Sequence, residues 1–149
     1  MKRFTLPLVY IILFMTVILV GMATATEIGQ IKTLNGEVFL IQDNAKSQAK
    51  LGDVLHQADV VETGGNGSVG ITFIDNSRFS VGPDSRIELR QFRFNPTTHE
   101  GEFVTDMPRG TLTVISGDIA KRSPEAMKIK TPSTILGFRG TKTAIKVTE

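Results

Sequence analysis

The 149-residue sequence contains no cysteine and no tryptophan. The absence of cysteine excludes a disulfide-stapled scaffold and a catalytic thiol. Small exported domains often rely on disulfides, so this chain must be held together by its hydrophobic core and its backbone hydrogen bonds. Its length favours one compact domain.

The first 25 residues differ in composition from the rest. Lys2-Arg3 precede an apolar run from Leu6 to Val20, and Ala23-Thr24-Ala25 supply small residues after it. This order is typical of a secretory signal peptide. The sequence therefore predicts a signal peptide over residues 1–25 and a mature domain over residues 26–149, located in the periplasm or secreted.

An uncleaved inner-membrane anchor is the alternative, because Leu6 to Met22 is close to the shortest apolar segment that spans a bilayer. Lipid attachment at the junction would need a cysteine, so we expect no lipid anchor.

Without residues 1–25, the chain carries 15 basic and 15 acidic residues. Residues 26–85 hold 4 basic and 8 acidic residues, whereas residues 86–149 hold 11 basic and 7 acidic ones. The single tyrosine, Tyr10, lies in the predicted signal peptide. Nucleic-acid binding is disfavoured, because it normally needs a net basic footprint and stacking aromatics.

Apolar residues recur with a period of two along the mature chain, as at Val69, Ile71 and Phe73. This period indicates strands, and frequent Gly, Pro and Asn turns separate them. The sequence predicts an all-β fold, with short strands in a twisted sandwich or a solenoid-like arrangement. A bulge is expected near Arg90-Gln91, where the alternation changes phase. The one candidate helix, Ala120 to Met127, contains Pro124.

Candidate metal ligands occur at Asp53, His56 and Asp59, which would share one face of a helix. This segment has the composition of a turn between two strands, and in extended structure the three side chains would not converge. We therefore predict surface polar residues there, and neither a metal nor a cofactor.

Candidate catalytic residues are few. A serine hydrolase would need His56 or His99 as its base, and the sequence has no Gly-x-Ser-x-Gly turn. Glu100 and Glu102 would point to the same side of a strand and could serve a glycosidase, but such pairs are usually solvated. The prediction is a protein without enzymatic activity and without catalytic residues.

The triplet Arg139-Gly140-Thr141 is the most distinctive motif near the C-terminus. Its glycine permits a turn that a Cβ would obstruct, and its arginine offers five hydrogen-bond donors. We expect it to pin a loop rather than to bind a ligand.

Taken in order, six motifs resemble the FecR domain, a periplasmic all-β module. Each is weak alone, and the order makes the set specific. They are Leu51-Gly52-Asp53-Val54-Leu55, Ala58-Asp59-Val60-Val61-Glu62-Thr63-Gly64, Asp75-Asn76-Ser77, Gly82-Pro83-Asp84-Ser85-Arg86-Ile87-Glu88-Leu89, Arg109-Gly110-Thr111-Leu112 with Gly117, and Lys130-Thr131-Pro132 through Arg139-Gly140-Thr141.

Three features depart from the family pattern. Ala58 and Asn76 stand where the family has glycine, and Lys142-Thr143 follows Arg139-Gly140-Thr141 where an aromatic is common. Asparagine tolerates positive φ in a tight turn. For Ala58 we expect an ordinary negative φ.

The resemblance implies a role in envelope sensing or interaction. In ferric-citrate-type regulators the domain lies between a sigma-factor-binding segment and a part that meets an outer-membrane transporter. This sequence has neither, so the sigma-factor pathway is not expected to carry over. The prediction is an exported module that binds another envelope protein, with strand edges as one means of contact. The alternative is a module that binds cell-wall glycan or peptidoglycan.

Overall fold

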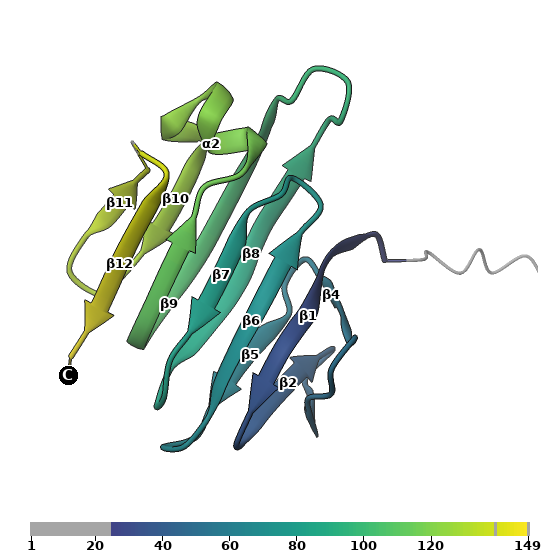
Figure 1. Cartoon of the computed structure of the whole chain (residues 1–149), viewed down its shortest axis with the longest axis vertical. Coiled ribbons are helices and arrows are strands. Elements are labelled where there is room, and N and C mark those ends of the chain that lie inside the picture. The colour runs from purple at the N-terminus through teal and green to yellow at the C-terminus, as the bar shows by residue number, and fades with distance from the viewer. Residues whose placement is uncertain (1–24, 139, 149) are drawn as a thin grey trace, which may run out of the picture.

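The computed structural model describes residues 25–138 and 140–148 (Figure 1). All of the predicted signal peptide except Ala25 lies outside them. Within the described residues, no helix is long and apolar enough to cross a bilayer. The elements are β1 (Glu27–Asn35), β2 (Val38–Gln42), β3 (Ala45–Gln48), β4 (Val54–His56), β5 (Val60–Thr63), β6 (Ser68–Phe73), β7 (Arg78–Val81), β8 (Arg86–Phe94), β9 (Gly101–Ile115), α2 (Asp118–Arg122), the 3-10 turn η1 (Pro124–Ala126), β10 (Met127–Lys130), β11 (Ile135–Gly137) and β12 (Lys142–Val147).

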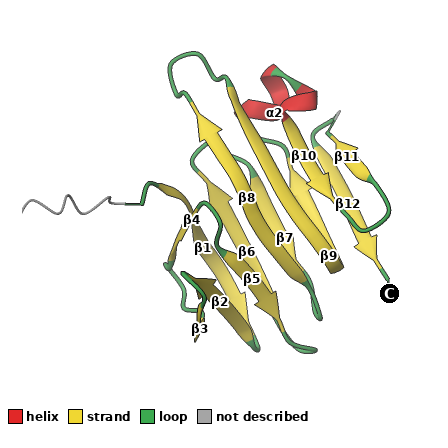
Figure 2. Cartoon of the chain, turned by 180° about the vertical axis from the view of Figure 1, so that it is seen from behind, coloured by secondary structure: helices red, strands yellow, loops and turns green. Residues whose placement is uncertain are grey.

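The predicted all-β fold is confirmed. The strands form one curled sheet, which is antiparallel except where β10 runs parallel to β9. Its two halves lie over each other, as the views from opposite sides show (Figures 1 and 2). Half A has the order β4-β1-β6-β7-β9-β12, and half B has the order β3-β2-β5-β8-β9-β10-β11.

Strand β9 belongs to both halves because it bends at Gly110. Before the bend it pairs with β8 and β10, and after it with β7 and β12. Gly110 has φ +103, and a Cβ there would lie 2.0 Å from the Ser85 Oγ. The Ser85 hydroxyl also accepts a hydrogen bond of 2.9 Å from the Thr111 N–H. The motif Arg109-Gly110-Thr111-Leu112 thus marks the passage of the chain from one half to the other.

The core lies between the halves and is centred on aromatic side chains. Phe103 of half B lies 4.7 Å from Phe73 and 5.1 Å from Phe79, both of half A, between ring centroids. Phe92 joins them at 4.8 Å from Phe103. All four rings are buried, and each contributes about 2–3 kcal/mol by leaving water. This packing accounts for the period of two, because every second residue enters the core.

The bulge in β8 and the helix after β9 were both predicted from the sequence. The pairing of β8 with β9 shifts register between Glu88 and Gln91, which confirms the bulge. The predicted helix is shorter and begins earlier, since α2 ends at Arg122 and Pro124 starts a separate 3-10 turn.

The expectation for Ala58 is wrong, and the expectation for Asn76 is confirmed. Ala58 has φ +73, in the left-handed region that glycine occupies most easily. Its backbone N–H donates a 2.7 Å hydrogen bond to the Leu89 carbonyl. The tight turn between β4 and β5 therefore fixes the conformation at this position whichever residue stands there. Asn76 has φ +66, as its place in a turn requires.

Replacing Gly110 tests the bend. We expect Gly110→Ala to lower the free energy of unfolding by about 2–5 kcal/mol, because the new methyl group collides with Ser85 and the positive φ is strained. Gly137→Ala is the control, since the nearest atom to its Cβ would lie 3.9 Å away. Urea denaturation of both variants measures the difference, and equal stabilities would contradict this account of the bend.

Candidate functional site

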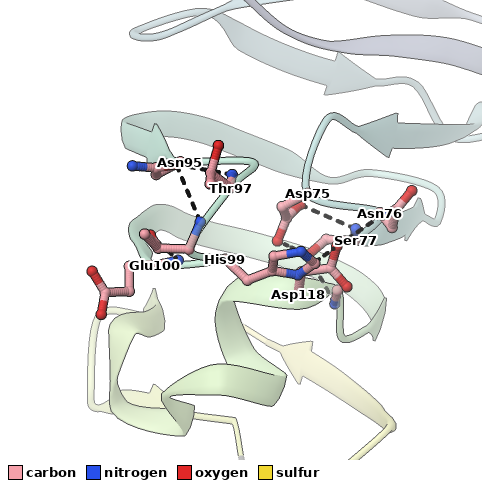
Figure 3. A network of polar contacts seen from close by, with 10 residues as sticks. Asp75, Asn76, Ser77, Asn95, Thr97, His99, Glu100 and Asp118 are labelled. Carbon is pink, nitrogen blue, oxygen red and sulfur yellow. Dashed lines mark hydrogen bonds and ion pairs between the residues drawn. The ribbon is translucent and has the colours of Figure 1, made fainter.

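The Asp75-Asn76-Ser77 motif and the residues Gly117-Asp118 come together at one end of the sheet (Figure 3). The Asp75 carboxylate accepts hydrogen bonds from the Ser77 N–H at 3.0 Å and from the Ser77 hydroxyl at 2.7 Å. The Ser77 Oγ accepts a 3.0 Å bond from the Gly117 N–H, and the Asp75 carbonyl accepts a 2.7 Å bond from the Asp118 N–H. The turn after β6 is thereby tied to the start of α2.

Asp75 and Ser77 are fully buried. Burial raises the pKa of the Asp75 carboxyl, although its hydrogen bonds with Ser77 act in the opposite direction. The Ser77 hydroxyl donates its proton to a carboxylate and has no access to solvent. This arrangement suits a structural tether rather than a nucleophile, which would need a base and an open approach for substrate.

His99 lies beside the same network, in the loop between β8 and β9. Its Nδ1 is 3.5 Å from the Asp118 Oδ2, which also accepts a 3.0 Å hydrogen bond from the Asn76 amide. The loop is held by Asn95, whose carbonyl accepts a 2.8 Å bond from the His99 N–H. The chemistry available here is therefore a histidine and carboxylate pair at the surface, which holds the loop against α2.

Among the candidate metal ligands, the structure brings two of the three together. The segment is a turn between β4 and β5, as predicted, but His56 Nδ1 lies 3.6 Å from the Asp59 Oδ2. The expectation that none would converge is wrong for this pair, because the turn folds Asp59 back to accept a 2.7 Å bond from the His56 N–H. The Asp59 carboxylate also accepts a 2.7 Å hydrogen bond from the Gln42 side-chain amide. Asp53 does not join this pair, and its carboxylate accepts a hydrogen bond from the Lys50 N–H.

The prediction of surface side chains is wrong for Asp59, which is buried because its carboxylate folds back to accept the hydrogen bonds from the His56 N–H and the Gln42 amide. The carboxylates of this turn thus accept hydrogen bonds from the backbone and from neighbouring side chains. The described part of the chain contains no group of three His, Cys, Asp or Glu residues that could hold a metal.

Glu100 and Glu102 do not form a pair on one strand. Glu100 precedes β9 in an exposed loop, with an oxygen 4.0 Å from Arg122. Glu102 lies on β9 and accepts hydrogen bonds from Gln91 at 2.8 Å and from Arg93 at 2.7 Å. Their environments are those of surface carboxylates in ion pairs.

Two members of the Arg139-Gly140-Thr141 triplet are tied to Ser116. The Ser116 hydroxyl donates a 2.8 Å hydrogen bond to the Gly140 carbonyl, and the Ser116 N–H donates a 3.0 Å hydrogen bond to the Thr141 carbonyl. Gly140 has φ +137. These contacts fit the predicted pinning role, and Arg139 lies outside the described residues.

The outer faces of the two halves differ in their charges. On half B, the cations of β3 and β8 are paired with acids: Lys46 with Glu62 at 2.6 Å, Arg90 with Asp106 at 2.7 Å and Arg93 with Glu102 at 2.7 Å, while Arg86 also contacts Glu62. Lys128 and Lys130 of β10 and Arg109 of β9 form no ion pair within the described residues. On half A, Glu27 at the start of β1 is the one acid at an exposed strand position among the described residues, and four outward cations have no acidic partner. These are Lys32, Arg78, Lys142 and Lys146, and none of them forms an ion pair within the described residues.

Strand β12 lies at the edge of half A, beside β9. The Ser116 N–H bond to Thr141 sets the pairing, so the backbone groups of Thr143 and Ile145 point towards β9. Those of Lys142, Ala144 and Lys146 point to the other side, where no described strand pairs with them. The period of two in the sequence predicted this strand. Its position at the edge could not be predicted, because it depends on pairing with β9, about 30 residues earlier in the chain.

An all-β module with a buried polar tether and an open edge is the class that these features define. The chain belongs to the FecR protein family, whose model matches residues 59–149. The resemblance read from the motifs is thereby confirmed, although Leu51-Gly52-Asp53 precedes the matched range. Membership in this family fits a module associated with the cell envelope.

Among solved structures, the chain is similar to one titled "Cell surface anchoring domain", with 38% sequence identity and a TM-score of 0.40. The match covers 42% of this chain and 84% of that one. No curated protein matches the sequence.

The buried carboxyl of Asp75 gives the stability a specific pH dependence. Its pKa is raised above the ordinary value of 3.8, so the folded state binds a proton more tightly than the unfolded state does. Lowering the pH through the raised pKa towards 3.8 should therefore favour the folded wild type relative to Asp75→Asn, which does not titrate. Urea denaturation at a series of pH values measures this difference. A difference that stays constant from neutral pH to pH 3.8 would contradict it.

Proposed function

We propose that the mature chain is an exported, non-enzymatic module of the cell envelope that binds another envelope protein. The free edge of β12 pairs with an extended, acidic segment of that partner. The observation that carries this proposal is the row of outward N–H and C=O groups at Lys142, Ala144 and Lys146.

The lengths of the edge strands favour β12 over the others. Strands β3, β4 and β11 have three or four residues each, whereas β12 has six. Longer edges offer a partner strand more hydrogen bonds. The strand is also anchored, since Ile145 is buried against the core and pairs with Leu112.

Charge supports an acidic partner. Residues 126–148 contain five basic residues and no acidic residue. A second copy of the chain fits this edge poorly, because antiparallel pairing of two β12 strands about Ala144 would set Lys142 of one opposite Lys146 of the other. Like charges directly opposite destabilise strand pairs.

The absence of enzymatic activity is part of the proposal. The Ser77 hydroxyl is bonded to Asp75 in the interior, and Glu102 is occupied by Gln91 and Arg93. The glycosidase arrangement that Glu100 and Glu102 would provide is not favoured, because Glu100 stands in a loop outside β9.

The test is photo-crosslinking in living cells from a probe at Lys146, in the otherwise unchanged chain. We expect one envelope protein to be crosslinked through an extended segment rich in Asp or Glu. Ala144→Pro should abolish this crosslink, because proline removes the outward N–H while an exposed edge position tolerates it. Mass spectrometry of the crosslinked peptide identifies the segment.

Two controls accompany this experiment. Ala144→Ser keeps the N–H and should keep the crosslink, and a probe at Arg93 on half B should not give it. Crosslinking that survives Ala144→Pro would overturn the edge as the docking site. The recovered protein should begin at Thr26, and recovery from the membrane with Met1 intact would contradict cleavage.

A further inference from the structure

The outer face of half A carries cations on alternate strands. In the order β1-β6-β7-β9-β12, which Figure 1 shows side by side, Lys32 lies on β1, Arg78 on β7 and Lys142 on β12. Arg78 and Lys142 are in one row across the sheet, because both pair with Ile115. Two strand spacings separate these two residues, which corresponds to roughly 10 Å.

Small and hydroxyl-bearing residues form the next outward row, beside the row of Arg78, Ile115 and Lys142. Thr33 pairs with Gly70, Gly70 with Ser80, Ser80 with Thr113, and Thr113 with Ala144. This row crosses five strands without a large side chain. A hollow of about 350 Å³ lies over its middle, with Lys32, Thr72, Arg78 and Ile115 at its rim.

We propose that this trough binds a linear acidic polysaccharide whose carboxylates are spaced one disaccharide apart. The cations are separated by about the length of a disaccharide, and the serine and threonine hydroxyls in the neighbouring row suit sugar hydroxyls. The site goes beyond the proposed protein contact, since it uses the face of half A rather than its edge.

The charge spacing argues against nucleic acid as the occupant. Each strand of a nucleic acid carries a phosphate about every 3.4 Å along the helix axis, several times denser than these cations. The face also lacks the features of a protein interface. Its outward positions around the hollow hold one sizeable apolar side chain, Ile115, and no aromatic ring. Ile71 and Phe79 also line the hollow, but they are buried in the core.

Binding of the polysaccharide to this trough would depend on ion pairs with its carboxylates and not on stacking of sugar rings on aromatic side chains. Sugar sites commonly use aromatic platforms, and the mature chain has no tryptophan or tyrosine. The outward cations of half A are Lys32, Arg78, Lys142 and Lys146. They face solvent without acidic partners among the described residues, so their charge is available to a ligand. Affinity for an acidic polysaccharide should therefore fall as salt is raised.

The experiment measures binding of the purified protein to hyaluronan oligosaccharides, which carry one carboxylate per disaccharide. A neutral chitin oligosaccharide of equal length and inorganic polyphosphate are the comparison ligands. We expect binding to hyaluronan at low salt and none to the neutral chain. The double variant Lys32→Glu with Arg78→Glu should weaken binding by roughly tenfold.

A matched variant separates local from general charge effects. Lys121→Glu with Lys130→Glu changes the net charge equally at two exposed positions outside this face, and it should keep the affinity. Equal loss in both double variants, or tighter binding of polyphosphate than of hyaluronan, would overturn the proposal. Ala144→Pro should leave binding of the polysaccharide unchanged, so failure of the β12 contact and failure of this site are distinguishable. Unchanged circular dichroism and melting temperature establish that the variants are folded.

Discussion

Ser85 and Gly110 touch where β9 leaves one half of the sheet and enters the other, and much of the molecule depends on that contact. The chain can bend there because residue 110 has no side chain and adopts φ +103. The Ser85 hydroxyl occupies the space and accepts the Thr111 N–H. The Ser85 N–H in turn donates to the Thr63 hydroxyl at 2.9 Å, so β5 is held at the same corner. Because of this bend, β9 pairs with four other strands, and the two halves of the sheet enclose a shared aromatic core.

The bend also determines which surfaces the molecule presents. It sends the end of β9 into half A, where β12 becomes the outermost strand, and it leaves β10 and β11 to complete half B. On the outer face of half B, the cations of β8 are held in ion pairs such as Arg90 with Asp106. The outer face of half A keeps its cations unpaired within the described residues. The two outer faces of one sheet therefore differ, because, in the part of the chain that the structure describes, β3 and β8 hold their cations in ion pairs and β1, β7 and β12 do not.

The period of two in the sequence was enough to predict the strands, the all-β class and the bulge in β8. The FecR resemblance was also readable, because turn residues such as Gly82 and Gly110 occur in a fixed order. The positive φ of Ala58 was not predictable, because alanine avoids this conformation and the turn between β4 and β5 imposes it. The convergence of His56 with Asp59 was missed for the same reason.

Long-range pairing limits what the sequence can reveal about function. Lys32, Arg78 and Lys142 are far apart in the chain, and only the strand order places them on alternate strands of one face. The alternation of polar and apolar residues is enough to predict that these cations point outward. It does not show that they lie on the same face of the sheet. The open side of β12 likewise follows from a single register, fixed by Ser116 and Thr141.

Amide hydrogen exchange resolved by residue measures most directly whether β12 is bonded on one side and open on the other. In the purified protein, the account predicts protected amides at Thr143 and Ile145. The amides of Lys142, Ala144 and Lys146 should exchange at rates close to those of an unstructured chain. Protection of all five amides would show that the edge is already covered, and it would contradict the account.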